Sequence, residues 1–298
     1  MLYYRRKVLL ALLQLFGGKL SVIPMQKYLF LFTREQISKS FFFVPYRYGC
    51  FSFQANQDML TLQTYGYVQE TDNCYTLLKN DVDYCAQLDL FDQQAMRNVV
   101  AQFGSLSQNE LITYTYIHYP FYAINSRIAA HLLNEEQLAR VEAQKRYKNE
   151  KRLFTIGYEG VSLEQYINKL LIEDIPVLCD VRKNAYSQKY GFNKSQLENA
   201  CKGVGIKYVH VPALGIDSSK RQDLRSQKDY DLLFEEYERT VLVNNQDALL
   251  YVQQLLSDYQ RIALTCFEKN PNQCHRLRVA KALLSMANND VPLTNISF

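Results

Sequence analysis

The chain has 298 residues and a net charge of +4; 48% of its residues are hydrophobic, 21% are charged, and it contains 11 Gly and 7 Pro. That composition excludes a disordered chain and fits packed globular protein, with enough length for two domains of common size. No apolar run approaches the roughly 20 residues needed to span a bilayer, which argues against a membrane protein, and the mild positive charge permits a polyanionic partner without requiring one.

The first part of the chain is predicted to be a helical, winged-helix-like domain over residues 1–83. Apolar residues at helical spacing predict helices over residues 5–16, 25–33 and 54–64. Gly17 and Gly18 end the first helix, and Ser21 offers a cap for the second. A short strand is expected around residues 75–77 after a turn. Helices followed by a small hairpin are typical of a winged-helix-like module.

Short motifs in this module resemble the Panacea family of antitoxin-associated domains over about residues 5–70. The motifs are Lys27-Tyr28-Leu29-Phe30, Arg47-Tyr48-Gly49-Cys50-Phe51, and Asp58-Met59-Leu60 leading to Gly66-Tyr67. Cys50 stands where that family favours proline. The alternative is a generic helical module in which Gly49 simply makes a turn.

Residues 84–150 are predicted to be a helical connecting region, because they are polar and end in a stretch with charges of both signs. Within them, residues 114–120 are compatible with a strand or with the edge of the first domain. The sequence leaves those two alternatives open.

From Leu153 onward, short β-rich runs alternate with helical stretches, which is typical of βαβ units and a parallel sheet. Strands are expected over residues 153–158, 176–181, 207–212 and 261–267. Helices are expected over residues 162–173, 193–204, 229–257 and 275–286, the first capped by Ser162. The fold class is therefore α/β, with a Rossmann-like parallel-sheet domain over residues 151–298. Ligands of such sheets bind outside the carboxyl ends of the strands.

The residues that follow these strands are unusually polar and form one candidate site. The candidate catalytic residues are Glu159, Asp180, Glu268, Cys266 and His275. We expect Tyr158, Arg182 and Arg276 to bind the substrate. Because Asp180 and Arg182 lie two apart on an extended segment, they point to the same face, while Cys179 points to the other face and belongs to the core.

The same segments resemble the domain-of-unknown-function 488 family over about residues 150–285. The matching motifs are Gly157-Tyr158-Glu159-Gly160, Asp180-Val181-Arg182, Ser187 with Gly191-Phe192-Asn193-Lys194, Tyr208-Val209-His210 with Leu214-Gly215, and Cys266-Phe267-Glu268 leading to Cys274-His275-Arg276. The resemblance implies an α/β fold and a site at these motifs, and it adds Ser187 and Lys194 to the residues expected to bind substrate. The chain departs from the family pattern at residues 184–186 and at Gln188. The resemblance implies no reaction.

One interpretation of the site relies on its carboxylates. Glu159, Asp180 and Glu268 would act as general acid and base or hold a divalent metal, while Arg182 and Arg276 bind a phosphate group. We therefore expect an enzyme that hydrolyses or modifies a nucleotide or nucleic acid, with an N-terminal module that binds nucleic acid or another protein. The alternative is a non-catalytic regulatory protein that binds nucleic acid or protein. A third reading is structural: an ion pair of Asp180 with Arg276, or of Glu268 with Arg182, would only tie strand ends together.

The cysteines support other interpretations. Seven cysteines without close pairs favour reduced thiols and a cytoplasmic location. Cys266 ends a strand before a helix start, where Arg276 would favour a nucleophilic thiolate and Glu268 would oppose it, so a buried small hydrophobe is preferred. Cys266, Cys274 and His275 are zinc-type ligands, but the adjacency of the last two is expected to aim them apart on a helix, which disfavours structural zinc. His275 would either carry a proton or make a packing contact.

Overall fold

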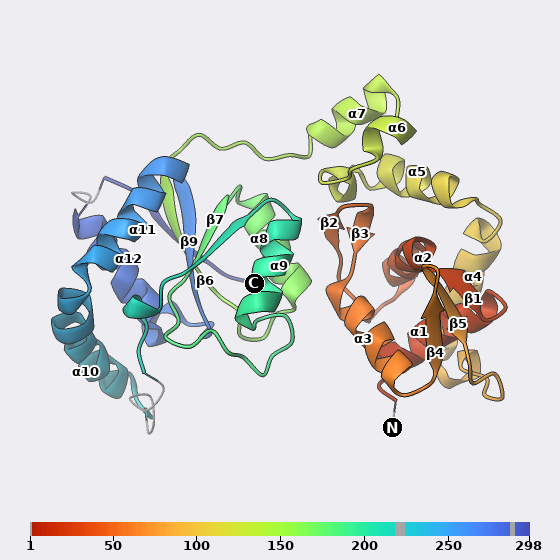
Figure 1. Ribbon diagram of the computed structural model, residues 1–298, viewed down its shortest axis with the longest axis horizontal. Coiled ribbons are helices and arrows are strands. Elements are labelled where there is room, and N and C mark those ends of the chain that lie inside the picture. Colours follow the sequence, from red (N-terminus) through yellow and green to blue (C-terminus); the bar gives the residue numbers. More distant parts are fainter. Residues whose placement is uncertain (1, 218–223, 287–289) are drawn as a thin grey trace. The chain divides into compact units, whose positions relative to one another are not determined.

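The structure is a computed structural model that describes residues 2–217, 224–286 and 290–298. The chain divides into two compact units, Met1–Lys145 and Arg146–Phe298 (Figure 1). Each unit has a hydrophobic core of its own. None of the helices in the described ranges has both the length and the apolar character that a bilayer crossing requires.

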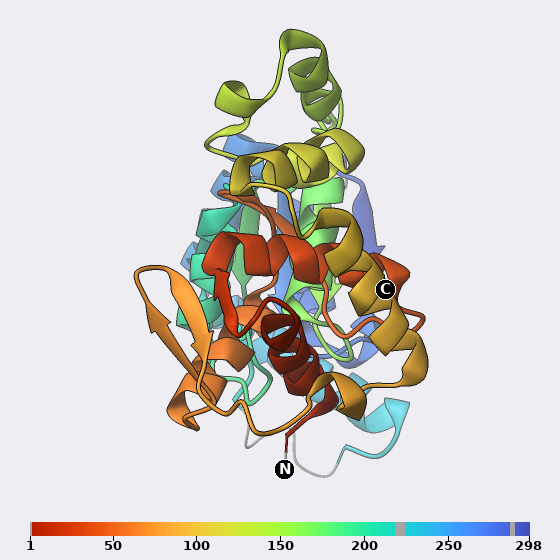
Figure 2. The ribbon, with the colours of Figure 1, turned by 90° about the vertical axis from the view of Figure 1, so that its right-hand side faces the viewer.

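The first unit combines helices with small antiparallel sheets. Its first elements are α1 (Tyr4–Leu15), β1 (Lys19–Ser21), α2 (Val22–Glu35), β2 (Val44–Tyr46), β3 (Gly49–Phe51), α3 (Phe53–Thr64), β4 (Val68–Thr71) and β5 (Cys74–Leu77). One sheet has the order β1-β5-β4, and β2 pairs with β3 separately. Figure 2 shows β4 and β5 (orange) at the edge of this unit. The helices predicted in this region are confirmed, and Gly17 and Gly18 follow α1 with φ of 70° and 81°.

The remainder of the first unit is helical. Its elements are η1 (Cys85–Gln87), α4 (Leu90–Phe103), α5 (Gln108–His118), η2 (Pro120–Ala123), α6 (Ala129–Leu132) and α7 (Glu135–Glu142). The strand considered for residues 114–120 is wrong, because α5 covers residues 114–118 and η2 begins at Pro120. Ser107 and Glu110 form a capping box that starts this helix. Met96 and Val99 of α4 lie in the same core as α1 and α2.

The second unit is a parallel sheet with helices on both faces (Figure 1). Its elements are β6 (Arg152–Gly157), α8 (Leu163–Ile172), β7 (Val177–Asp180), α9 (Lys194–Gly203), β8 (Lys207–His210), η3 (Pro212–Leu214), α10 (Gln227–Tyr237), η5 (Glu238–Leu242), α11 (Gln246–Tyr259), β9 (Arg261–Cys266), η6 (Pro271–Gln273), α12 (His275–Met286) and β10 (Leu293–Ile296). The sheet order is β10-β6-β9-β7-β8, and each neighbouring pair is parallel. The predicted strands and their parallel arrangement are confirmed; β10 is an additional strand that the sequence did not predict.

The single helix predicted over residues 229–257 is wrong. The chain forms α10, a π-helical turn (η5) and then α11 as separate segments. Asn245 lies between η5 and α11 and breaks the helix there, with φ −126° and ψ 42°. Its side chain donates a hydrogen bond to the Val241 carbonyl at 2.7 Å. Asparagine competes in this way with the helical backbone bonds, which explains the break.

The two faces of the C-terminal sheet pack against different helices. Leu153, Cys179 and Leu264 share a core with residues of α11 and α12, while α8 and α9 lie on the opposite face (Figure 1). Cys179 is 0% exposed and belongs to this core, as predicted. Since side chains alternate along a strand, Asp180 lies on the α8 and α9 face and Cys266 on the α12 face.

Candidate functional site

The carboxyl ends of β6, β9 and β7 lie side by side, because β9 pairs with both neighbours. Gly157 of β6 pairs with Cys266, and Asp180 of β7 pairs with Thr265. The chain leaves β6 and β7 toward α8 and α9 on one face, and it leaves β9 toward α12 on the other (Figure 1). A crevice forms at the carboxyl edge of a parallel sheet where neighbouring connections separate in this way.

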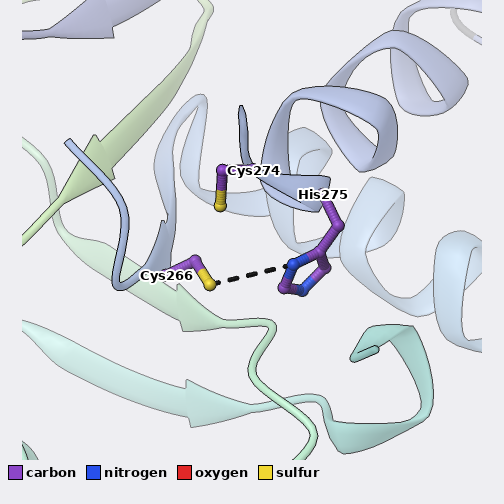
Figure 3. A group of neighbouring side chains, drawn as sticks. All are labelled: Cys266, Cys274 and His275. Carbon is purple, nitrogen blue, oxygen red and sulfur yellow. Dashed lines mark hydrogen bonds between the residues drawn. The ribbon is translucent and has the colours of Figure 1, made fainter. Parts of the chain in front are cut away.

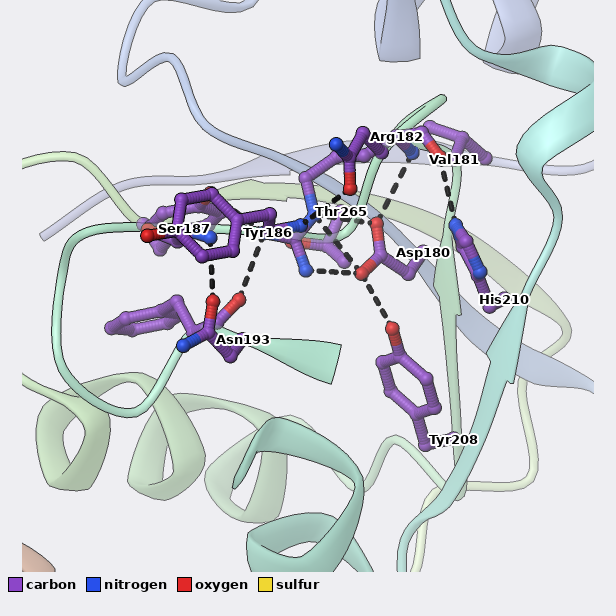
Figure 4. A network of polar contacts seen from close by, with 12 residues as sticks. Asp180, Val181, Arg182, Tyr186, Ser187, Asn193, Tyr208, His210 and Thr265 are labelled. Atoms are coloured by element: carbon purple, nitrogen blue, oxygen red, sulfur yellow. Dashed lines mark hydrogen bonds and ion pairs between the residues drawn. The ribbon is translucent and has the colours of Figure 1, made fainter. Parts of the chain in front are cut away.

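A buried hydrogen-bond network occupies the end of β7 (Figure 4). Arg182 Nε donates to both carboxylate oxygens of Asp180 at 2.8 and 3.0 Å, and its Nη2 donates to Asp180 Oδ2. The Tyr208 hydroxyl donates to the same Oδ2 at 2.6 Å. Arg182 Nη1 donates to the Tyr158 hydroxyl at 2.7 Å and to the Phe192 carbonyl at 2.9 Å. Asp180 is 0% exposed, so in this geometry its carboxylate orients Arg182.

Electrostatics reinforce this network. Burial tends to lower the pKa of Arg182, but the hydrogen bonds and charge of Asp180 outweigh it and hold that pKa above its ordinary value. Burial raises the pKa of Tyr208, and the charge of Asp180 raises it further. Burial also raises the pKa of Tyr158, which Arg182 partly offsets. The guanidinium therefore stays charged and both phenols stay protonated at neutral pH.

Arg276 contacts the backbone of the loop between β9 and α12. It is 1% exposed, and its Nη1 and Nη2 donate to the carbonyl oxygens of Glu268 and Lys269 at 2.6 and 3.3 Å. Asp180 thus pairs with Arg182 instead of Arg276. Glu159 is exposed and accepts from the Lys269 backbone N–H at 2.8 Å, while Glu268 is partly buried. Arg276 and Glu159 therefore both hold the loop in place.

A pocket of about 220 Å³ opens between the strand ends. It is lined by Tyr158, Arg182, Lys183, Asn184, Tyr186, Ser187, Ile216, Cys266, Phe267 and His275. Half of the predicted site residues are therefore here: Tyr158, Arg182, Ser187, Cys266 and His275. None of the described lining residues carries a carboxylate, so Glu159, Asp180 and Glu268 do not line it.

Of the predicted substrate-binding residues, Lys194 and Arg276 do not line this pocket. Lys194 is exposed at the start of α9 and lines a neighbouring hollow with Tyr186 and His210. Ser187 is partly buried, and its Oγ accepts from the Lys189 backbone N–H at 3.1 Å. Sequence reasoning missed Lys183, which directly follows Asp180-Val181-Arg182; its position after a strand was the signal that could have found it.

Cys266, Cys274 and His275 lie close together (Figure 3), and Cys266 and His275 also line the pocket. One ligand atom from each lies within 4.8 Å of the others, and all three residues are buried. Cys266 Sγ is 3.8 Å from His275 Nδ1, and His275 Nε2 is 2.8 Å from the Val181 carbonyl oxygen. Because a carbonyl only accepts, Nε2 carries a proton, and in the tautomer with that single proton Nδ1 faces Cys266 with its lone pair.

The expectation that Cys274 and His275 point apart is wrong. Cys274 precedes α12 and has extended backbone angles, φ −136° and ψ 132°, so only His275 belongs to the helix. The thiol of Cys274 can therefore turn toward Cys266. Burial raises the pKa of Cys274 well above its ordinary value, and hydrogen bonding with Cys266 raises it further.

The first unit contains a separate hollow of about 600 Å³. Lys27, Gly49 and Cys50 line it, and all three come from the motifs that resemble Panacea domains. Lys27 is 2% exposed, and its Nζ donates to the Cys50 carbonyl at 2.9 Å. Burial lowers the pKa of Lys27. Gly49 has φ of 90°, and a Cβ there would lie 2.5 Å from the Tyr116 ring, so only glycine fits.

Lys27→Met is expected to raise the free energy of unfolding by about 1–3 kcal/mol, because it removes a buried ammonium group and keeps a side chain of similar length. Urea unfolding of the two proteins measures the difference. Lys39 is exposed and provides the control, since Lys39→Met should change stability by less than about 0.5 kcal/mol. A loss of stability in Lys27→Met would contradict the expectation.

The fold and the strand-end pocket together define an α/β domain with a candidate site at the carboxyl edge of a parallel sheet. Residues 162–283 match the model of the family described as "Domain of unknown function DUF488", so the C-terminal half carries a DUF488 domain, as its motifs predicted. No curated protein and no solved structure matches the chain. The resemblance of the N-terminal motifs to Panacea domains stays a prediction.

Proposed function

We propose that the chain is an enzyme that hydrolyses or modifies a nucleotide or nucleic acid in the strand-end pocket. The observation that carries the proposal is the lining of this pocket. Arg182 and Lys183 supply positive charge, Tyr158, Tyr186 and Phe267 supply aromatic rings, and no described lining residue is acidic. Cations attract phosphate, and aromatic rings stack on bases.

The size of the pocket fits part of a nucleotide. Its volume of about 220 Å³ is below the roughly 300–1,000 Å³ typical of pockets that enclose a drug-sized ligand. A base or a phosphate group would therefore enter, while the rest of the nucleotide or strand stays outside. We assign the reacting groups to Cys266 and His275, because both line the pocket. Asp180 is not assigned this role, because its carboxylate accepts hydrogen bonds from Arg182 and Tyr208.

The proposal also includes a more specific fold for each of the two units. The C-terminal domain is Rossmann-like in the broad sense of a parallel sheet with helices on both faces. In the first unit, the element order and the β1-β5-β4 sheet support a winged-helix-like module, with α3 as its recognition helix and the β4–β5 hairpin as its wing.

The alternative is a regulatory protein without catalysis, and one observation favours a protein partner for the N-terminal unit. Helix α3 contains no Lys or Arg, whereas helices that bind DNA rely on cations for phosphate contacts.

Turnover decides between the enzyme and the regulatory protein. Cys266→Ser should abolish product formation from a nucleotide or oligonucleotide panel, detected by mass spectrometry, while ligand binding persists; binding without turnover in the wild type would favour the regulator.

Lys183→Gln is expected to weaken nucleotide binding about fivefold, which is ~1 kcal/mol, because Lys183 is an exposed cation at the pocket. The slope of the logarithm of the binding constant against the logarithm of salt concentration should become shallower by about one. Calorimetry with nucleoside phosphates and a short single-stranded oligonucleotide, at several salt concentrations, measures both quantities. Lys202→Gln makes the same charge change on α9 outside the pocket lining and should leave binding unchanged. Equal losses in the two variants, or no binding at all, would contradict the proposal.

A further inference from the structure

We infer that Cys266, Cys274 and His275 bind a zinc ion at the wall of the strand-end pocket that Cys266 and His275 line. The metal site itself stands on the geometry of these three side chains. Only the chemistry assigned to the ion rests on the proposed function.

The spacing of the three ligand atoms suits zinc. Tetrahedral zinc with bonds of about 2.3 Å to sulfur and 2.0–2.1 Å to nitrogen places its ligand atoms roughly 3.6–3.8 Å apart. Cys266 Sγ and His275 Nδ1 are already 3.8 Å apart, and the whole group lies within 4.8 Å. An ion could therefore be bound with small side-chain movements.

The surroundings orient the imidazole as a zinc ligand requires. Histidine ligands commonly donate their second ring N–H to a carbonyl, which fixes the ring and leaves the other nitrogen for the metal. His275 Nε2 donates to the Val181 carbonyl at 2.8 Å, and Nδ1 faces Cys266. The Tyr237 ring packs edge-on against His275 with 5.7 Å between centroids, so the imidazole has little freedom to turn.

The loop between the two cysteines is also held before any ion arrives. Arg276 donates to the carbonyl oxygens of Glu268 and Lys269, and Asn270 Oδ1 accepts from the Asn272 backbone N–H at 3.0 Å. These bonds fix the path of the chain from Cys266 to Cys274. Preorganised ligands bind a metal more tightly, because less conformational entropy is lost on binding.

Charge and ligand type favour zinc over magnesium and calcium. Two thiolates and a neutral imidazole balance a divalent ion, so the complex adds no net charge to a buried site. Sulfur and imidazole ligands suit zinc, whereas magnesium and calcium prefer oxygen ligands. A Cys266–His275 nucleophile would need no Cys274, and a disulfide would need no His275; zinc uses all three.

The position of the site gives the ion a chemical role. Cys266 and His275 line the pocket, whereas Cys274 does not. Three protein ligands leave one coordination position for water or substrate, and zinc lowers the pKa of bound water toward neutrality. In hydrolysis, water would give its hydroxyl group to the attacked phosphorus or carbon, the bond to the leaving group would break, and the leaving group would take the other proton of the water.

The experiment measures metal in the full chain, purified without chelators or a histidine tag. Plasma mass spectrometry should find about one zinc per chain in wild type and less than about a tenth in Cys274→Ser. Cys201→Ser is the matched control, because Cys201 is another fully buried cysteine, on α9, and should keep the zinc. Replacement by cobalt should give a thiolate-to-cobalt absorption band in wild type and in the control.

The outcomes separate the metal site from the proposed function. Absence of both zinc and the cobalt band in wild type, or equal zinc in Cys274→Ser, would overturn the metal site and leave nucleotide binding untouched. Zinc without nucleotide binding would overturn the proposed function alone. If Cys274→Ser does not fold, the wild-type cobalt spectrum still decides the question.

Discussion

Asp180→Ala is expected to lower the free energy of unfolding by about 3–5 kcal/mol, because it leaves the guanidinium of Arg182 buried without its counter-charge. Arg182 is 5% exposed and Asp180 is 0% exposed, so both members of the pair are largely shielded from water. Urea unfolding followed by circular dichroism measures the change. Tyr208→Phe removes only one hydrogen bond to the same carboxylate and should lower stability by about 1.5–3 kcal/mol.

An exposed aspartate provides the control for this substitution. Asp231 Oδ1 lies 3.6 Å from Arg278 Nη2, and the side chain of Asp231 is 51% exposed. Asp231→Ala should therefore change stability by less than about 1 kcal/mol, as is typical of surface ion pairs. If Asp180→Ala were no more destabilising than Asp231→Ala, the buried pair would not be stabilising the end of β7.

Gly157→Ala is expected to lower the free energy of unfolding by about 2–3 kcal/mol through overpacking. A Cβ at this position would lie 2.0 Å from the backbone oxygen of Glu268 and 3.2 Å from Arg276 Nη2. The loop after β9 would have to move, and that loop joins Cys266 to Cys274. The variant should therefore also lose affinity for the metal, which competition with a chelator measures.

Gly160→Ala separates this clash from the ordinary effect of replacing glycine. Gly160 has φ of 79° but no atom within 4 Å of an added Cβ. Its replacement should cost about 1 kcal/mol for the left-handed backbone and leave the loop in place. Equal losses of stability in the two variants would show that the loop does not depend on close approach at Gly157.

The sequence predicted the elements of the fold better than their arrangement. Alternation of β-rich and helical stretches was enough to find β6, β7, β8 and β9, because each is short, rich in β-branched, aromatic or other apolar residues, and bounded by loops. It did not reveal β10, whose residues 293–296 are partly exposed at the sheet edge. Nor could it reveal that β9 lies between β6 and β7, since all three are apolar on both faces and none specifies its neighbour.

The positions of the site residues at the edge of the sheet were predictable, but the directions in which their side chains point were less so. Tyr158, Arg182, Ser187, Cys266 and His275 were expected at the carboxyl edge of the sheet, and they line one pocket there. The relation of Cys274 to His275 depended on which of them begins α12, a boundary that sequence patterns locate only to within a few residues. The pairing of Asp180 with Arg182 depended on Tyr208 and Phe192, which come from other parts of the chain.

The central place of β9 has a consequence for how the C-terminal unit forms during synthesis. Its neighbours β6 and β7 end at residues 157 and 180, but β9 begins only at residue 261. Until that segment leaves the ribosome, the two earlier strands lack their common partner and expose unpaired backbone edges and apolar faces, a condition that promotes aggregation. Contacts between such distant segments also slow folding. During synthesis the C-terminal unit therefore stays incomplete until its last segments emerge, whereas the first unit has its whole core by residue 145.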